Sequence, residues 1–286
     1  MITPMTENSI DVPALKKMLG FQKRADVSGL LFFGTTGEPL SLDAYEKTKI
    51  IETANECCGK IPIVCGISSP VTRIAADTAK LYTKLGADAI MAITPYYYRC
   101  TDEGIFEHFK TVSEATDLPV IVYNVPARTG FDLSKKPELT EKICRLKNIC
   151  AIKNAIADRT ESEKFILRTT KNVLCGDDEN NLFCWQKGAT GSISVVSDLL
   201  PELLVLQHKA HIENDEEKVG KIDAALRKVY AVTAKVPNPI AIKYACAFRY
   251  GFAPVIRLPL TRPPQSLEKE IEKATLDALK ITEELQ

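Results

Sequence analysis

The chain has 286 residues, of which 45% are hydrophobic and 26% are charged, the balance of a globular protein with one large domain or two smaller ones. Lys plus Arg and Asp plus Glu both number 37, so no charge excess indicates nucleic acid or an anionic membrane as a partner. No apolar run reaches the length of a membrane span, and no signal peptide is predicted at the start.

The nine cysteines favour a reducing compartment. Their number is odd, no pair has CxxC spacing, and several lie in apolar runs where they act as small hydrophobic residues. A disulfide framework or a zinc site is therefore not expected, and the three histidines do not have the spacing of a catalytic metal site. We expect a cytoplasmic protein that needs no metal and no other cofactor.

Short apolar runs alternate with segments of helical periodicity from the start of the chain to about residue 214. The predicted strands are 29–33, 61–65, 89–93, 120–123, 149–153, 172–175 and 191–196, with a stub at 1–3. The predicted helices between them include 43–58, 71–85, 102–115, 138–145 and 161–170. This alternation is typical of a parallel sheet covered by helices.

Seven strands and a stub give the eight that close a (β/α)8 barrel, so we predict an α/β protein of this class. A doubly wound open sheet is the alternative, but neither GxGxxG nor GxxxxGK[ST] follows the first strands. The stub at 1–3 is very short for a barrel strand. Either the true start lies upstream, or the barrel is closed poorly at this point.

Beyond residue 214 the pattern contains only helices, predicted at 215–235, 239–250 and 266–285. The sequence PNP at 237–239 marks a break between two of them. We therefore predict a catalytic barrel over residues 1–214 and a helical C-terminal region over 215–286.

Lys153 ends the apolar run 149–153, which predicts a buried strand with an amine at its end. Burial of an ammonium is costly, so such a lysine is normally paired or has a lowered pKa. A neutral lysine is a nucleophile that forms a Schiff base with a carbonyl compound. The other interpretation is a lysine whose ammonium extends to solvent.

Polar motifs follow several other predicted strands. They are GTTGE at 34–38, TPYYY at 94–98, YNVPARTG at 123–130, GDD at 176–178 and GSI at 191–193. In a barrel, the residues after the strand ends lie on one rim, where the active site is found. Each motif alone also fits a turn, packing aromatics or a surface ion pair. Their occurrence together on one predicted rim favours a catalytic site that includes Lys153.

These motifs, with IK at 152–153, PNP at 237–239 and RLPL at 257–260, resemble the dihydrodipicolinate synthase family. The family belongs to the pyruvate-dependent class I aldolases, which include N-acetylneuraminate lyase. The resemblance implies condensation of pyruvate with L-aspartate-4-semialdehyde in lysine and diaminopimelate biosynthesis. It also implies a homotetramer built as a dimer of dimers. YNVPxRTG favours the synthases over the sugar-acid lyases.

The resemblance also implies roles in proton transfer. Lys153 would form the Schiff base with pyruvate, and Tyr123 would lie over the imine and transfer protons. Thr36 would link Tyr123 to Tyr97, with Tyr97 donated across a tight dimer interface.

A second group of residues would bind the substrates. Thr35 and Thr36 would hold the pyruvate carboxylate, and Gly176 and Ile193 would make backbone contacts around pyruvate. Arg128 would bind the carboxylate of the semialdehyde, because its planar fork matches a carboxylate.

The chain departs from the family pattern at three places, one of which is a slightly longer segment between Tyr123 and Lys153. The lysine is commonly followed by Glu-Ala-Thr-Gly, whereas here Asn154-Ala155-Ile156-Ala157 follow, so the surroundings of the imine are predicted to differ. Segments 39–47 and 68–74 lack the polar residues of lysine-inhibited members, which predicts weak or absent inhibition by lysine.

Two other functions fit the same predicted fold. One is a retro-aldol lyase acting on a 2-keto-3-deoxy sugar acid through the same lysine. The other is a barrel that binds a partner without catalysis. The short predicted first strand and the altered residues after Lys153 favour this alternative. Arg128 favours the synthase over the lyase, since a small aldehyde that carries a carboxylate needs a cation at this place and a polyol chain does not.

Overall fold

The computed structural model describes residues 1–285 and divides the chain into two units. The middle unit is Pro62–Ser194. The terminal unit combines Met1–Ile61 with the residues from Val195 onward. The predicted division at residue 214 stays a prediction.

The middle unit, described throughout, contains six parallel strands that are neighbours in chain order. They are β2 (Ile63–Ile67), β3 (Ala89–Ile93), β4 (Val120–Asn124), β5 (Ile149–Asn154), β6 (Asn172–Cys175) and β7 (Gly191–Ser192). A doubly wound sheet reverses its strand order at a switch point, and these strands do not. The order is that of barrel winding, as predicted.

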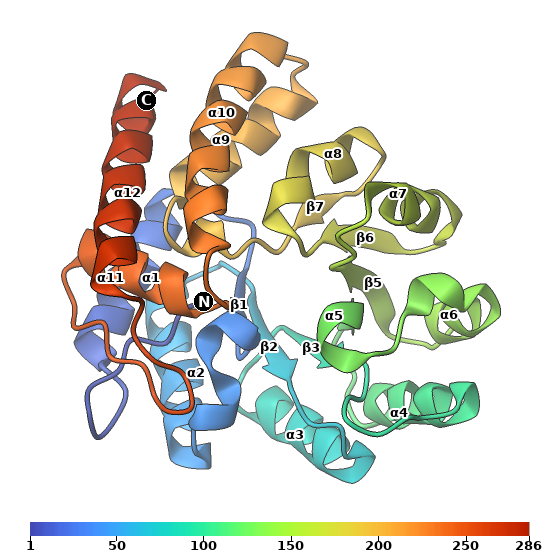
Figure 1. Cartoon of the computed structure of the whole chain (residues 1–286). Helices are drawn as coiled ribbons and strands as arrows, with labels where there is room; N and C mark the ends of the chain where they lie inside the picture. The colour runs from blue at the N-terminus through green and yellow to red at the C-terminus, as the bar shows by residue number, and fades with distance from the viewer. Residues whose placement is uncertain (286) are drawn as a thin grey trace. The chain divides into compact units, whose positions relative to one another are not determined.

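Helices connect these strands and cover them along one side (Figure 1). They are α3 (Thr72–Lys84), α4 (Asp102–Glu114), α5 (Pro126–Thr129), α6 (Pro137–Cys144), α7 (Arg159–Arg168) and α8 (Asn181–Gln186). Several begin at a side chain that accepts a backbone hydrogen bond, such as Thr101 from the amide of Gly104 at 3.2 Å. Strand β4 is buried along its whole length, as expected of a strand that is covered on both faces.

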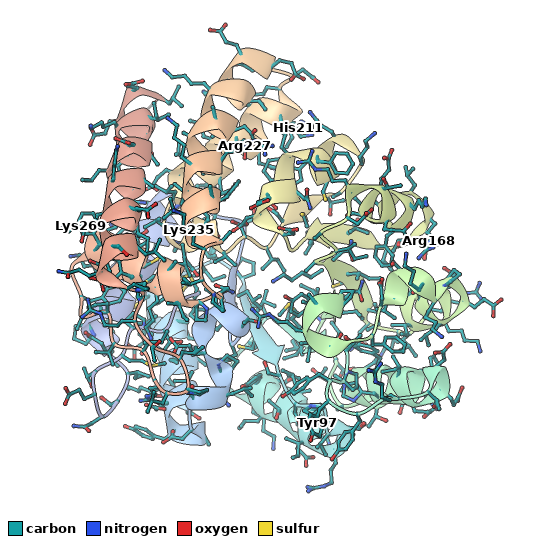
Figure 2. The ribbon with its side chains drawn as sticks, viewed as in Figure 1. Tyr97, Arg168, His211, Arg227, Lys235 and Lys269 are labelled. Atoms are coloured by element: carbon teal, nitrogen blue, oxygen red, sulfur yellow. The ribbon has the colours of Figure 1, made fainter. Side chains whose placement is uncertain are left out.

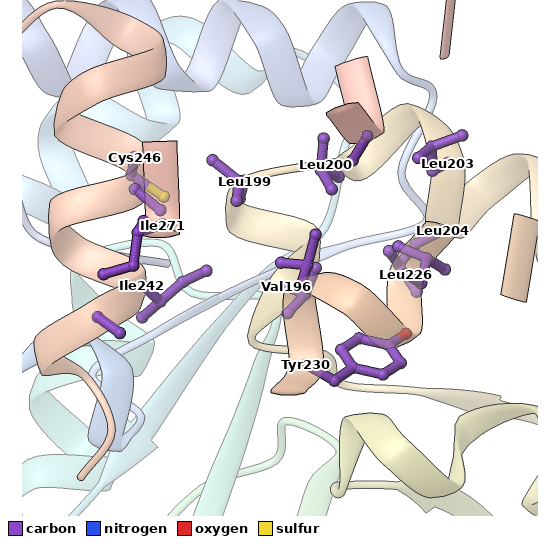
Figure 3. Packing of buried hydrophobic residues seen from close by; sticks show 14 of the residues in the cluster. Val196, Leu199, Leu200, Leu203, Leu204, Leu226, Tyr230, Ile242, Cys246 and Ile271 are labelled. Carbon is purple, nitrogen blue, oxygen red and sulfur yellow. The ribbon is translucent and has the colours of Figure 1, made fainter. Parts of the chain in front are cut away.

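The terminal unit is mainly helical and holds its own core. Its elements include α1 (Val12–Arg24), β1 (Leu30–Phe32), α2 (Ala44–Cys58), α9 (Pro201–Ile212), α10 (Glu216–Thr233), α11 (Ile240–Tyr250) and α12 (Gln265–Leu285). Figure 3 shows the apolar side chains of the last four helices and of the segment before α9 packed together, among them Leu199, Leu226, Ile242 and Ile271. Each such buried side chain contributes roughly 1.5–3 kcal/mol.

The predicted strand at 1–3 is wrong. Thr3 is bound through its side chain, whose hydroxyl donates to the Gly37 carbonyl at 2.8 Å, and the ammonium of Met1 donates to the Leu31 carbonyl. These are single bonds rather than a ladder, because Pro4 has no amide to continue one. The predicted strand 191–196 is also too long, since a 3₁₀ turn begins at Val196.

The other predicted strands and helices lie within about two residues of those observed, the usual uncertainty of element ends. Helix α1 is an element that the sequence analysis did not predict. Among the residues described, none of the helices combines the length and apolar character that crossing a membrane requires.

Acid should destabilise the protein through His108, which is 2% exposed on α4 and bonded through Nδ1 to the Thr72 hydroxyl at 3.0 Å. Burial lowers the pKa of His108 to about 4. Between that value and the ordinary pKa of about 6.5, the unfolded chain binds the proton more readily. Stability is therefore unaffected above this window and falls by up to about 1.4 kcal/mol per pH unit within it.

Urea unfolding at pH 7, 6 and 5 measures this effect in the wild type and in His108→Gln. The variant should lose less stability on acidification than the wild type. His211→Gln, on α9, is the control and should retain the wild-type pH dependence. An identical acid slope in the wild type and His108→Gln would show that His108 is not responsible.

Candidate active site

The amine of Lys153 lies beside the ring of Tyr123. The two residues are register partners near the ends of β5 and β4, and Lys153 Nζ is 4.4 Å from the centroid of the Tyr123 ring. Each is 7% exposed, so the predicted burial of Lys153 is confirmed. A buried amine next to a phenol supplies a nucleophile and a proton donor at the end where barrel enzymes place their sites.

Gly176 follows β6 and leaves room for the lysine. A Cβ at this position would lie 2.8 Å from Lys153 Cε and 3.1 Å from its Cγ. The Gly176 amide donates to the Asn154 carbonyl at 2.8 Å, which keeps the two segments in contact beyond the strand end. Ile193 follows β7 in the same way, and its amide donates to the Cys175 carbonyl at 2.8 Å. Both residues thus lie at strand ends of the middle unit.

Arg128 lies on α5, the short helix that directly follows Tyr123 and β4. Its side chain is exposed, and the turn ends at Gly130, whose φ of 67° favours glycine. The Thr129 hydroxyl donates within the turn to the carbonyls of Val125 and Phe131. Arg128 is therefore an exposed residue on a well-bonded loop.

The three consecutive tyrosines differ in their surroundings. Tyr96 is partly buried and donates to the Ser68 carbonyl at 2.8 Å, whereas Tyr97 is 91% exposed. Figure 2 shows the Tyr97 side chain at the periphery of the middle unit. Its φ of 74° lies in the left-handed region, and its ring meets the edge of Tyr98 at 5.8 Å. Among residues 62–194 of this chain, no hydrogen bond joins Tyr97 to Tyr123.

Thr35 and Thr36 belong to the terminal unit, in the 3₁₀ turn Thr35–Gly37 that follows β1. Thr36 is buried, and its hydroxyl accepts a hydrogen bond from Asn238 Nδ2 at 3.1 Å. A Cβ at Gly37 would lie 2.9 Å from the Met1 carbonyl oxygen, so only glycine fits there. The N-terminal segment and the residues before α11 thus fix this turn.

The sequence analysis missed a buried ion pair beneath the same turn. Lys243 Nζ on α11 lies 2.5 Å from Glu38 Oε1, and their side chains are 1% and 0% exposed. Burial lowers the pKa of Lys243, and the Glu38 carboxylate opposes that shift. The backbone amide of Arg257 also donates to Glu38 at 3.4 Å. Lys243 lies in the apolar first half of the helix Ile240–Tyr250, away from its basic end at Arg249, and this position is the sequence signal that could have identified it.

Comparisons with known proteins give one consistent result. The model of the dihydrodipicolinate synthetase family matches residues 1–280. The 4-hydroxy-tetrahydrodipicolinate synthase of Rickettsia bellii (strain OSU 85-389) is 36% identical over 277 residues, which are 96% of this chain and 93% of that protein. The corresponding enzyme of Hyphomonas neptunium is 33% identical over 279 residues, covering 96% and 94% of the two chains.

Solved structures agree over the whole chain. The chloride-inhibited dihydrodipicolinate synthase of Acinetobacter baumannii, crystallised with pyruvate, has a TM-score of 0.90 at 31% identity and covers 97% of this chain and 96% of its own. The synthase of Thermotoga maritima has a TM-score of 0.92 at 29% identity and covers 97% and 96%. The predicted fold class, a (β/α)8 barrel with a helical C-terminal region, is confirmed.

Replacing Lys243 with methionine should strongly destabilise the protein. The variant leaves the Glu38 carboxylate buried without its cation, which costs roughly 3–5 kcal/mol. Adding Glu38→Gln to Lys243→Met removes that charge and should restore part of the loss. Unfolding in urea gives the free energies for the two single variants and the double variant.

Lys235→Met is the matched control, since Lys235 pairs with Glu270 at 2.5 Å while both are about half exposed. Its loss should be at most about 1 kcal/mol. Equal losses in Lys243→Met and Lys235→Met would contradict the assignment of a buried, stabilising pair.

Proposed function

Because the chain belongs to the dihydrodipicolinate synthetase family, we propose that it condenses pyruvate with L-aspartate-4-semialdehyde to 4-hydroxy-tetrahydrodipicolinate. The observation that carries the proposal is the buried Lys153 amine, 4.4 Å from the centre of the Tyr123 ring. A Schiff-base reaction needs a nucleophilic amine and a nearby group that transfers protons, and these two side chains supply both.

The reaction proceeds in two stages. The amine of Lys153 attacks the keto carbon of pyruvate, and loss of water leaves an iminium. The iminium draws electrons from the adjacent methyl group, which loses a proton and becomes an enamine carbon. That carbon attacks the aldehyde carbon and forms the new carbon–carbon bond, while the aldehyde oxygen takes up a proton transferred through the phenol of Tyr123. The amino group of the semialdehyde then attacks the iminium carbon, which closes the ring and expels Lys153 as the free amine. The imine is itself the electron sink, so the chemistry requires neither a metal nor a nucleotide.

We assign Thr35 and Thr36 to the pyruvate carboxylate, with backbone contacts to pyruvate from Gly176 and Ile193. The hydroxyl of Thr36 accepts from Asn238, so its own proton remains available for donation. Thr36 would also connect Tyr123 with Tyr97 in proton transfer.

We further propose that Tyr97 acts in a partner subunit's site, within a homotetramer built as a dimer of dimers. The 91% exposure of its ring supports this, since large aromatic side chains are enriched at subunit interfaces. The nine cysteines, all present as thiols, support a reducing compartment such as the cytoplasm. There the enzyme would serve lysine and diaminopimelate biosynthesis.

Arg128 is the residue that we assign to the carboxylate of the semialdehyde. Replacement by lysine keeps the charge but loses the two-pronged contact. Arg128→Lys should therefore raise the KM for the semialdehyde about 10-fold or more, while the KM for pyruvate stays unchanged. Arg73→Lys, at an exposed arginine that pairs with Asp77 on α3, is the control and should behave as the wild type.

The same assays decide between the proposed reaction and its alternatives. Wild-type protein is given pyruvate with the semialdehyde, and separately a 2-keto-3-deoxy sugar acid. Cleavage of the sugar acid without condensation would identify a lyase. No activity and no pyruvate adduct after borohydride reduction would indicate a binding protein.

Gly176→Ala tests the position of the lysine. The added methyl group would overlap Lys153 Cε and displace the amine from Tyr123. We expect the rate of pyruvate trapping by borohydride to fall roughly 10- to 100-fold, since a displacement near 1 Å is enough for that loss. The control is Gly220→Ala on α10, where a Cβ meets nothing within 4 Å. Normal trapping in Gly176→Ala would contradict the arrangement.

A further inference from the structure

A row of buried polar side chains lies directly behind the candidate site. Successive residues of a strand point to opposite faces, so Asn124 and Asn154 face away from Tyr123 and Lys153, which precede them. Asn124 and Asn154 are register partners, and Asn154 also pairs with Cys175 of β6. The row, which begins with Thr94 after β3, is at most 2% exposed at every position.

The two asparagines form a continuous set of hydrogen bonds. Asn124 Nδ2 donates to Asn154 Oδ1 at 3.0 Å, and Asn154 Nδ2 donates to the Ser162 hydroxyl on α7 at 3.3 Å. The other contacts of Asn124 lie downstream of α5. Its Nδ2 also donates to Asp132 Oδ1 at 3.4 Å, and its Oδ1 accepts from the Leu133 amide at 3.1 Å.

The bonds of Asn124 close the loop that carries Arg128. This loop leaves β4 after Asn124, contains α5, and returns at Asp132 and Leu133. Asp132 also accepts from the Ser134 amide at 2.8 Å, which orders the returning end. The base of the Arg128 loop is therefore bonded, through Asn124, to the residue that follows Lys153.

We propose that Asn154 is a positioning residue that fixes the Arg128 loop relative to Lys153 and thereby sets the affinity for the aldehyde substrate. The inference rests on the proposed function and on the role of Arg128 in it. Asn154 touches neither substrate, since its side chain is on the opposite face of β5. It acts through Asn124, because Asn154 Oδ1 accepts a hydrogen bond from the side-chain amide of Asn124.

An asparagine side chain at position 154 makes two hydrogen bonds without a charge, because its amide has both an acceptor and a donor. Asn154 accepts from Asn124 and donates to Ser162 at once. A carboxylate at position 154 would be buried in the same bonded group as Asp132. Leucine has the same number of side-chain heavy atoms as asparagine and makes neither contact.

The test compares Asn154→Leu with Thr94→Val. Thr94 belongs to the same buried row, but its hydroxyl has no partner among residues 1–285, so valine there should be neutral. Asn154→Leu should raise the KM for L-aspartate-4-semialdehyde about 10-fold, the equivalent of roughly one hydrogen bond. The KM for pyruvate and the rate of borohydride trapping should stay within about two-fold of wild type.

Hydrogen exchange gives a readout that does not depend on activity. The Leu133 amide, which donates to Asn124, should exchange about 10-fold faster in Asn154→Leu and at the wild-type rate in Thr94→Val. Of the hydrogen bonds that Asn154 makes, Ser162→Ala removes only the one with α7, and it adds no charge. It should raise the aldehyde KM only about three-fold, and it replaces Asn154→Leu in the test if that variant does not fold.

Three results would overturn the inference. One is an unchanged aldehyde KM in both Asn154→Leu and Ser162→Ala, and another is unaltered exchange of the Leu133 amide in Asn154→Leu. The third is a fall in kcat and melting temperature together with a rise in both KM values, which substitution of a residue that only packs would produce. Absence of a pyruvate adduct in the wild type would instead overturn the proposed function, and this inference with it.

Discussion

The pairing of β4 with β5 is the constraint on which the site depends. It sets Tyr123 opposite Lys153 and brings the amine to 4.4 Å from the ring centre. A slip of one residue would turn every side chain of one strand to the other face. Because the same register sets Asn124 opposite Asn154, one strand pairing determines both the reactive pair and the amides behind it. The positions of the reactive side chains and of the two asparagines are therefore set by the same strand register.

Several residues of the polar motifs GTTGE and TPYYY cost stability locally and are held by their surroundings. Glu38 and Tyr97 have φ values of 52° and 74°, which non-glycine residues adopt at a cost of about 1–3 kcal/mol each. Glu38 is also paired with Lys243 in the interior, where removal from water offsets much of the attraction between the charges. Strained and buried polar residues of this kind cluster where a protein binds or reacts. Glu38 lies in the motif GTTGE and Tyr97 in the motif TPYYY, which agrees with the roles proposed for Thr35, Thr36 and Tyr97.

Local sequence patterns predicted the strands and the place of Lys153, because a strand or helix is determined mainly by neighbouring residues. They did not reveal partners that are distant in the chain. Asn238 bonds Thr36 across 202 positions, and Lys243 bonds Glu38 across 205. The prediction of a strand at 1–3 was wrong for the same reason. Hydrogen bonds from the Met1 ammonium and the Thr3 hydroxyl hold this segment, and it forms no strand ladder. Motif resemblance supplied the roles that periodicity could not.

A crystal structure of the protein soaked with pyruvate and reduced with cyanoborohydride tests the central claim most directly. The account predicts continuous electron density from Lys153 Nζ to the second carbon of pyruvate, with the Tyr123 ring beside the new bond. Density for pyruvate joined to another lysine, or bound without a covalent bond while Lys153 Nζ points away from it, would contradict the account.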